Sequence, residues 1–219
     1  MPKLHPSNRN LHLHSFDSFC GAPVLTKFLP MVTEYLGALH ATLVNALRDY
    51  PRVLTVRFEP TIPTAISDRM TAEDHKELIR RFIASLRAII KHDRERKCQS
   101  GWAPDTKVRY VWCREVGING KPHYHLLLIL RRDAYHMIGK ACSPNENLFN
   151  RISRAWHSAL GLEWNREQPL IYVSDHPMYW IDRGNDEQFS EAFHRASYMC
   201  KADTKQYGNG MRAFGTSRS

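Results

Sequence analysis

The sequence has few features of an exported, disulfide-stabilised or membrane-spanning protein. Its five cysteines are scattered and form no CxxC pair, which argues against a zinc knuckle or a disulfide framework. No apolar run approaches the length of a membrane span, the longest covering residues 126–130. The first residues, MPKLHPSNRNLHLHSF, contain no continuous apolar signal segment, and no internal repeat is evident. We therefore expect a reduced, cytoplasmic protein with no membrane partner.

The composition favours a globular protein with a positive field. Of the 219 residues, 42% are hydrophobic and 24% are charged, which is enough for one domain with its own core. The formal net charge is +9, with cations concentrated in residues 80–97 and 195–219. A field of this sign favours polyanions, nucleic acid above all, although a basic surface that only maintains solubility is an equal alternative.

Residue periodicity predicts a mixed arrangement of strands and helices. We expect the first twenty residues to be a loose polar arm and residues 208–219 to be a basic tail. Alternation and apolar runs predict strands at residues 52–59, 107–115, 123–130 and 170–174. Amphipathic spacing predicts helices at residues 24–47, 143–160 and 187–204, and a further helix that begins after Thr71 and has an apolar stripe from Leu78 to Ile90. This order predicts an α+β fold in which helices cover one face of an antiparallel sheet.

Local signals define several element ends. The capping-box patterns TAED, from Thr71, and SPNE, from Ser143, predict the starts of two helices. Gly161 is expected to end the second of these helices. Between the two central strands, Asn119-Gly120 is typical of a β-hairpin turn.

A metal site is predicted on that hairpin. His123 and His125 are two residues apart on one strand and therefore share a face. Glu115 ends the preceding strand, and the hairpin would bring it opposite the two imidazoles. Such a set could hold a divalent ion with open positions for water or a phosphate oxygen. An HxH pair alone is weak evidence, since His12 and His14 form a second one in the polar arm.

The last predicted helix carries a candidate nucleophile. His194, Tyr198, Lys201 and Lys205 lie on one polar stripe at spacings of four, three and four. Tyrosine can form covalent intermediates, and a neighbouring cation would favour its phenolate. The plain alternative is that Tyr198 is a half-buried packing residue. Arg57, Arg195, Lys205 and Arg212 are candidate phosphate contacts.

Taken in order, these motifs resemble those of the HUH endonucleases, and most closely the replication proteins of inoviruses and bacterial prophages. RVLTVRFEP resembles the family's first strand, KPHYH its histidine motif, and YMCK its single-tyrosine nucleophile motif. The resemblance covers roughly residues 50–219. Some members carry a second tyrosine four positions after the first, whereas this chain has Ala202 there.

The resemblance implies both a fold and an activity. The fold would be an RRM-like antiparallel sheet in residues 51–219, preceded by an N-terminal arm and helix in residues 1–50. The activity would be nicking and joining of single-stranded DNA at a replication origin, starting rolling-circle replication in a bacterial host. Glu115, His123 and His125 would hold Mg²⁺ or Mn²⁺, and Tyr198, assisted by Lys201, would form a 5′-phosphotyrosine. Host helicase and polymerase would be further partners.

Two other functions remain open from the sequence. The same chemistry would serve a conjugative relaxase or a single-strand transposase. A non-catalytic DNA-binding regulator on the same fold belongs to a different class. Covalent attachment to labelled single-stranded DNA distinguishes an enzyme from a regulator, which would only bind the DNA.

Overall fold

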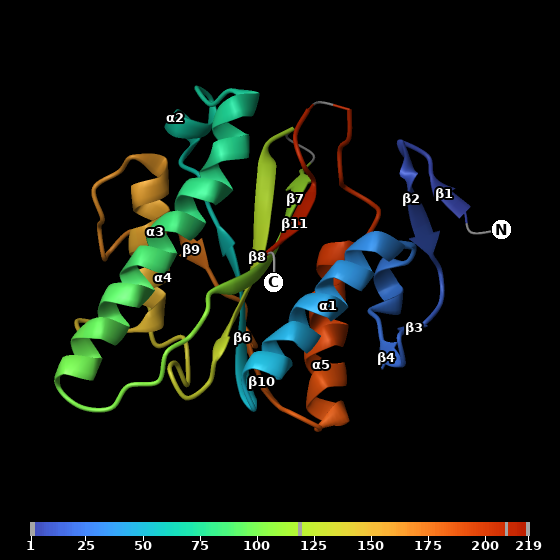
Figure 1. Cartoon of the computed structure of the whole chain (residues 1–219). Coiled ribbons are helices and arrows are strands. Elements are labelled where there is room, and N and C mark those ends of the chain that lie inside the picture. Colours follow the sequence, from blue (N-terminus) through green and yellow to red (C-terminus); the bar gives the residue numbers. More distant parts are fainter. Residues whose placement is uncertain (1–2, 118–119, 209, 218–219) are drawn as a thin grey trace.

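The computed structural model of the chain describes residues 3–117, 120–208 and 210–217, and its centre is an antiparallel β-sheet (Figure 1). The strands of this sheet, in spatial order, are β10 (Met178–Asp182), β6 (Arg52–Pro60), β8 (Pro122–Arg131), β7 (Arg109–Val116) and β11 (Phe214–Thr216). A short strand, β9 (Ile171–Tyr172), also pairs with β6. The predicted α+β class with an antiparallel sheet is therefore confirmed.

Helices cover both faces of the sheet. Figure 1 shows α3 (Ala72–Gln99) and α4 (Leu148–Leu160) on one side, and α1 (Thr33–Asp49) and α5 (Asp186–Ala196) on the other. The prediction that helices cover only one face is wrong. On β6, Leu54 and Val56 belong to the core beneath α3 and α4, while Val53 belongs to the core beneath α1 and α5. Successive strand residues point to opposite faces, so a strand buried on both sides needs apolar residues in both registers.

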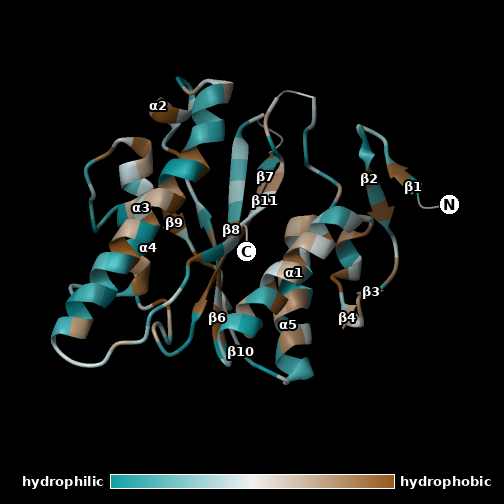
Figure 2. Cartoon of the chain, in the orientation of Figure 1, coloured by the Kyte–Doolittle hydropathy of each residue, from teal (hydrophilic) through white to brown (hydrophobic). Residues whose placement is uncertain are grey.

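The two cores differ in the residues that fill them. The core beneath α3 and α4 contains the large aromatic residues Phe58, Phe82, Phe149 and Trp156, and the Trp156 indole donates to the Thr61 carbonyl at 2.8 Å. The second core is largely aliphatic beneath α1 and gains Phe193 from α5. Figure 2 shows hydrophilic and hydrophobic residues alternating along α3, as an amphipathic helix against a sheet requires.

The predicted helix ends are partly correct. The Thr71 capping box is confirmed, since the Asp74 amide donates to Thr71 Oγ1 at 3.2 Å and the Thr71 amide donates to Asp74 Oδ2 at 2.9 Å. Gly161 ends α4 in a left-handed conformation, also as predicted. The Ser143 capping box is wrong, because α4 begins at Leu148. Its cap is Asn147, whose side chain accepts from the Asn150 amide at 2.8 Å.

The N-terminal segment, residues 3–32, forms regular strands and a turn, so the prediction of a loose arm is wrong. It contributes a three-stranded sheet of β1 (Lys3–His5), β2 (Asn8–His14) and β5 (Met31–Val32), and a small hairpin of β3 (Ser18–Phe19) and β4 (Ala22–Pro23). Helix α1 begins at Thr33 rather than near residue 24, because a 3₁₀ turn (Thr26–Phe28) and Pro30 precede it. The predicted division at residue 50 falls between α1 and β6, which contribute to one core.

Some helices and strands of the structure were not predicted from the sequence, and others differ from the prediction in length. The helix α2 (Thr64–Ser67) and strand β10 are absent from the sequence-based prediction, and β9 is shorter than predicted. The predicted basic tail is wrong in part, because residues 214–216 form β11 and pair with β7. The strand hairpin β7–β8 is confirmed, although Asn119 of its predicted turn lies outside the described residues. No helix in the described part of the chain is long and apolar enough to cross a bilayer.

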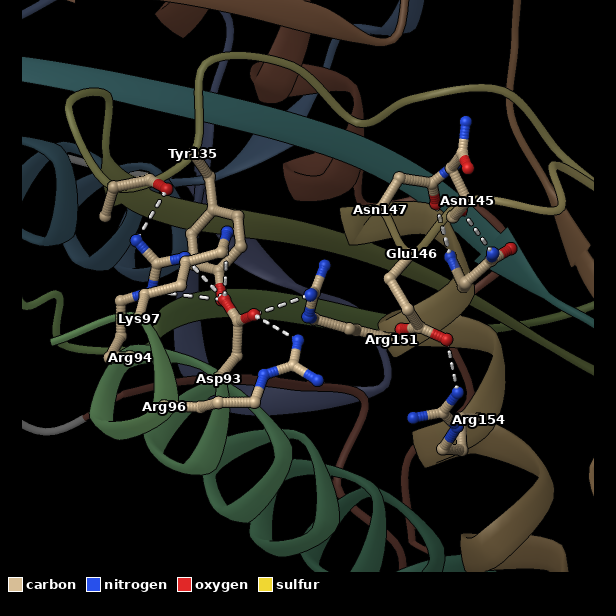
Figure 3. A network of polar contacts seen from close by, with 12 residues as sticks. Asp93, Arg94, Arg96, Lys97, Tyr135, Asn145, Glu146, Asn147, Arg151 and Arg154 are labelled. Carbon is tan, nitrogen blue, oxygen red and sulfur yellow. Dashed lines mark hydrogen bonds and ion pairs between the residues drawn. The ribbon is translucent and has the colours of Figure 1, made fainter. Parts of the chain in front are cut away.

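A buried ionic network joins α3 to α4 (Figure 3). The Asp93 carboxylate, 3% exposed, accepts from Arg151 at 2.6 Å and from the Tyr135 hydroxyl at 2.7 Å, and it also contacts the Arg94 guanidinium. Arg94 further donates to the Ala134 carbonyl at 3.0 Å. Burial opposes ionisation of Asp93, but Arg94, Tyr135 and Arg151 outweigh it and lower its pKa from 3.8 to about 2.

This lowered pKa predicts a loss of stability in acid. A carboxylate with a depressed pKa in the folded state stabilises the fold above its unfolded pKa and loses that contribution as pH falls. We expect the difference in free energy of unfolding between the wild type and Asp93→Asn to shrink by about 1 kcal/mol between pH 6 and pH 3. Urea unfolding at several pH values measures it. A difference that stays constant with pH would contradict the assignment.

Candidate functional site

The hairpin β7–β8 brings the predicted acidic and histidine residues onto one face of the sheet. Glu115 pairs directly with His123, and Cys113 pairs with His125. All four lie on the face covered by α1 and α5, and Tyr124 belongs to the opposite core. The prediction that Glu115 lies across the hairpin from the two histidines is therefore confirmed.

His125 is buried between two carboxylates, whereas His123 is exposed. The Nε2 atom of His125 lies 3.5 Å from Glu115 Oε2, and its Nδ1 lies 3.1 Å from Glu59 Oε1. The second contact is an ion pair without hydrogen-bond geometry, since Nδ1 is a buried atom with no hydrogen-bond partner. Burial lowers the pKa of His125, but the two carboxylates outweigh this effect and raise it.

The Glu115 carboxylate is also neutralised by two lysines. Lys201 Nζ lies 2.8 Å from Glu115 Oε2, and Lys205 Nζ lies 3.4 Å from Oε1. Burial opposes ionisation of Glu115, but His125, Lys205 and Lys201 outweigh it and lower its pKa to about 2. This side chain is therefore a carboxylate at every physiological pH.

The donor set fits a divalent ion, although the donors are not yet arranged around one. Imidazole and carboxylate ligands suit several divalent metals. The buried His125 Nδ1 makes no hydrogen bond of good geometry and faces the Glu59 carboxylate at 3.1 Å, so this imidazole already lies among the kinds of group that bind a metal. Within residues 3–117, 120–208 and 210–217, however, no three His, Cys, Asp or Glu side chains already surround one point. A metal at Glu115 would have to compete with Lys201 and Lys205.

Tyr198 lies beside this cluster. Its hydroxyl accepts from Lys201 Nζ at 2.9 Å, and its ring meets that of His125 edge-on with centroids 5.3 Å apart. The Phe28 ring packs against the Tyr198 ring with centroids 4.8 Å apart, and the Arg57 guanidinium lies 5.5 Å from the Tyr198 centroid. Partial burial raises the pKa of Tyr198, and the hydrogen bond from Lys201 only partly offsets this, so the phenol is protonated at neutral pH.

A tight turn rather than a long helix positions Tyr198. The prediction of a helix through residue 204 is wrong, because α5 ends at Ala196 and a 3₁₀ turn, η2 (Ser197–Cys200), follows. The N-terminal segment holds this turn: the Leu25 amide donates to Ser197 Oγ at 3.0 Å, and the Ala202 amide donates to the Pro30 carbonyl at 3.0 Å. Lys205 therefore approaches Glu115 from a loop and not from a helical stripe.

The other predicted DNA contacts are divided between two faces. Arg57 and Arg195 line one small cavity near Tyr198, and Arg195 is exposed there. The Lys205 side chain is fully buried against Glu115. Arg212 lies beyond the opposite face of the sheet, where its carbonyl accepts from Arg114 at 3.3 Å. The structure thus gathers Arg57, Arg195 and Lys205 near the site and places Arg212 elsewhere.

Glu59 is the site residue that sequence reasoning missed. It is the last residue but one of β6 and shares a face with Arg57. It lies one position beyond the Phe58–Leu126 pair and therefore opposite His125. The interaction with His125 outweighs burial and lowers the pKa of Glu59. The alternation of RVLTVRFE places Arg57 and Glu59 on one face of the strand. It does not show which strand pairs with β6, so it could not place Glu59 beside His125.

The fold and site together define an α+β protein with a tyrosine, two lysines, a histidine and two carboxylates at one end of its central strands. The chain belongs to the family described as the YagK/YfjJ C-terminal domain, whose model matches residues 16–217. It is 37% identical over 146 residues to the uncharacterized protein YfjJ of Escherichia coli strain K12, covering 64% of this chain and 70% of that protein.

A second relative from the same organism is similar over more of its length. The uncharacterized protein YagK is 29% identical over 199 residues, covering 85% of this chain and 93% of the relative. No solved structure matches the chain. The family match begins at residue 16 and therefore includes most of the N-terminal segment that holds the Tyr198 turn.

Proposed function

We propose that the protein is a metal-dependent endonuclease that nicks and rejoins single-stranded DNA, and that it starts rolling-circle replication at an origin. The observation that carries this proposal is the position of Lys201 Nζ, 2.9 Å from the Tyr198 hydroxyl and 2.8 Å from Glu115. A nucleophile, a cation and a carboxylate are thus in direct contact, beside His125. Host helicase and polymerase would act on the nicked DNA, and no membrane is involved.

The residues support a transesterification at phosphorus. Tyr198 Oη attacks the scissile phosphate, so that a bond from phosphorus to the phenolic oxygen forms and the bond to the 3′-oxygen breaks. The phenol loses its proton and the leaving 3′-oxygen gains one, which leaves a 5′-phosphotyrosine and a 3′-hydroxyl. Because the phenolic oxygen is the better leaving group, attack by that hydroxyl reverses the step and rejoins the strand.

Lys201 supplies charge at the developing phenolate and at the phosphate. The desolvation of Lys201 lowers its pKa, but contact with Glu115 and Tyr198 raises it overall, so it stays an ammonium group. Glu115, His123 and His125 would hold the divalent ion, Mg²⁺ or Mn²⁺, which would polarise the phosphate as a Lewis acid. Arg57 and Arg195 are placed to contact neighbouring phosphates.

A second candidate is a DNA-binding regulator without catalysis. The observation that favours it is the neutralisation of Glu115 by Lys201 and Lys205, which gives both oxygens of this carboxylate a cationic partner with which a metal would have to compete. In a regulator this arrangement would be permanent and would stabilise the fold. In the enzyme, the two lysines would instead contact the bound phosphate.

Metal dependence separates the two candidates. We expect the wild type to attach covalently to labelled single-stranded DNA in Mn²⁺ but not in EDTA, as seen by denaturing electrophoresis. His125→Ala and His123→Ala should each reduce the attachment at least about a hundredfold, because each removes a ligand of the ion. The variant with both His12→Ala and His14→Ala is the control and should attach like the wild type. Unchanged attachment in His125→Ala would show that the site assignment is wrong.

A further inference from the structure

A basic groove with aromatic residues lies on the other face of the sheet from Tyr198. It is formed by α3, β7 and residues 210–212, and its volume is about 560 Å³. This volume lies within the range of ligand-binding pockets. The groove and the Tyr198 site share the same two strands: Arg114 of the groove precedes Glu115, and Tyr124 lies between His123 and His125.

Two half-buried aromatic side chains form its floor. Tyr110 and Trp112 alternate on β7 and so point to the same side. Trp112 lies against Gly215, where an added Cβ would come within 2.5 Å of the indole Nε1. Tyr124 supports Trp112 from behind, with ring centroids 6.5 Å apart. The aromatic rings are therefore held in place and still reachable from the groove.

Cations surround this floor. Arg80, Arg87 and Arg212 are exposed, and the Arg87 guanidinium lies 5.9 Å from the Tyr110 centroid. Along the groove, as far as its residues are described, the one acidic side chain is Glu77, which contacts Arg80. Buried Arg114 donates to the carbonyls of residues 206 and 212 and thereby fixes the far wall.

We propose that this groove binds an unpaired stretch of single-stranded DNA outside the nicking site. Its bases would stack on Tyr110 and Trp112, and its phosphates would contact Arg80, Arg87 and Arg212. Aromatic side chains flanked by cations bind single strands in this way, because every base has a face that can stack. The proposal rests on the proposed function only for the choice of DNA as the polynucleotide.

Charge reversal at the rim tests the groove. The variant Arg80→Glu/Arg87→Glu is compared with Arg81→Glu/Lys91→Glu, which changes two exposed cations of the same helix that do not line the groove. Binding of fluorescein-labelled dT20 is measured by anisotropy in EDTA, where no cleavage occurs. We expect the groove variant to bind at least about tenfold more weakly, with a salt dependence shallower by about 1 to 2 units of slope. The control should stay within about threefold of the wild type.

Crosslinking provides a measurement on the unaltered protein. A dT20 in which thymines are replaced by 5-bromodeoxyuridine is irradiated in complex with the wild type and digested with trypsin. Cleavage after Arg109 and Arg114 releases one short peptide that contains both Tyr110 and Trp112. Crosslinks on this peptide are expected. Their absence, together with unchanged affinity of the groove variant, would overturn the proposal.

The outcomes distinguish this proposal from the proposed function. If the groove variant binds dT20 more weakly but the wild type never attaches covalently to DNA, the groove proposal is supported and the nicking activity is rejected. If the wild type attaches covalently to DNA but the groove variant keeps its dT20 affinity, the nicking activity is supported and the groove proposal is rejected. Tighter binding of U20 than dT20 would overturn the assignment to DNA. Equal binding of a 20-base-pair duplex would overturn the assignment to a single strand.

Discussion

Tyr198→Phe is expected to abolish the covalent protein–DNA adduct while leaving the affinity for single-stranded DNA within about threefold of the wild type. The change removes one oxygen and keeps the ring that packs against Phe28 and His125. Lys201 loses one hydrogen-bond partner and keeps its ion pair with Glu115. Denaturing electrophoresis with labelled DNA and Mn²⁺ measures the adduct, and anisotropy in EDTA measures binding.

Mass spectrometry of the trypsin-digested adduct identifies the attached residue. The expected peptide covers residues 196–201, since Arg195 and Lys201 are the flanking cleavage sites. Two other tyrosines are poor candidates: Tyr124 is buried in the opposite core, and the Tyr207 hydroxyl accepts from Tyr35 at 3.1 Å. DNA on either of them, or an adduct that persists in Tyr198→Phe, would show that the wrong nucleophile was assigned.

Lys201→Ala is expected to have a smaller effect on the adduct than Tyr198→Phe. It removes the ammonium group from Tyr198 and Glu115 but leaves the nucleophile, so the adduct should form more slowly without disappearing. Single-turnover rates give the comparison. A rate equal to that of the wild type would assign Lys201 a purely structural role.

Asp93→Ala is expected to destabilise the fold by about 3 to 5 kcal/mol, the usual cost of removing one partner from a buried ion pair. Arg94 and Arg151, which are 6% and 4% exposed, would lose their carboxylate, and the Tyr135 hydroxyl would lose its acceptor. Figure 3 shows these groups converging on Asp93 from α3, α4 and the loop after β8. Equilibrium unfolding in urea at pH 7 measures the change.

Glu95→Ala is the matched control, because Glu95 lies two residues further along α3. Its side chain is 57% exposed and contacts Lys91 at 3.7 Å, and exposed pairs of this kind contribute at most about 0.5 kcal/mol. A similar loss of stability in both variants would indicate a change in the helix itself. A loss below about 1 kcal/mol in Asp93→Ala would mean that the network contributes little.

The sequence predicted elements best where one signal was strong and local. The Thr71 capping box and the amphipathic stripe that follows it define α3, and the Asn-Gly pair between two apolar runs indicates the β7–β8 hairpin. Local signals failed where they competed. Ser143 and Asn147 both precede an apolar stretch with cap-forming side chains, and the structure uses Asn147. Most of the strands at the N-terminus are only two or three residues long, which is too short for an alternating pattern to identify them.

The candidate site was predictable only within single elements. The Asn-Gly pair indicated a hairpin, so the sequence alone placed Glu115 near His123 and His125, but this pair did not fix the exact register in which Glu115 faces His123. The approach of Tyr198 and Lys201 to that hairpin was inferred from the family resemblance, since no local pattern relates residues so far apart. Glu59 was missed because its role depends on β6 pairing with β8, which is a long-range contact.

The contact between the N-terminal segment and the Tyr198 turn has a consequence for when the residues around Tyr198 come together during synthesis. Leu25 and Ser197, which hydrogen-bond to each other, are 172 residues apart. Since a chain leaves the ribosome from its N-terminus, the early strands must wait for nearly the whole polypeptide before they meet this turn. Closing so large a loop is slow compared with forming helices. A nascent or truncated chain therefore lacks the N-terminal contacts that hold the Tyr198 turn beside Glu115 and His125.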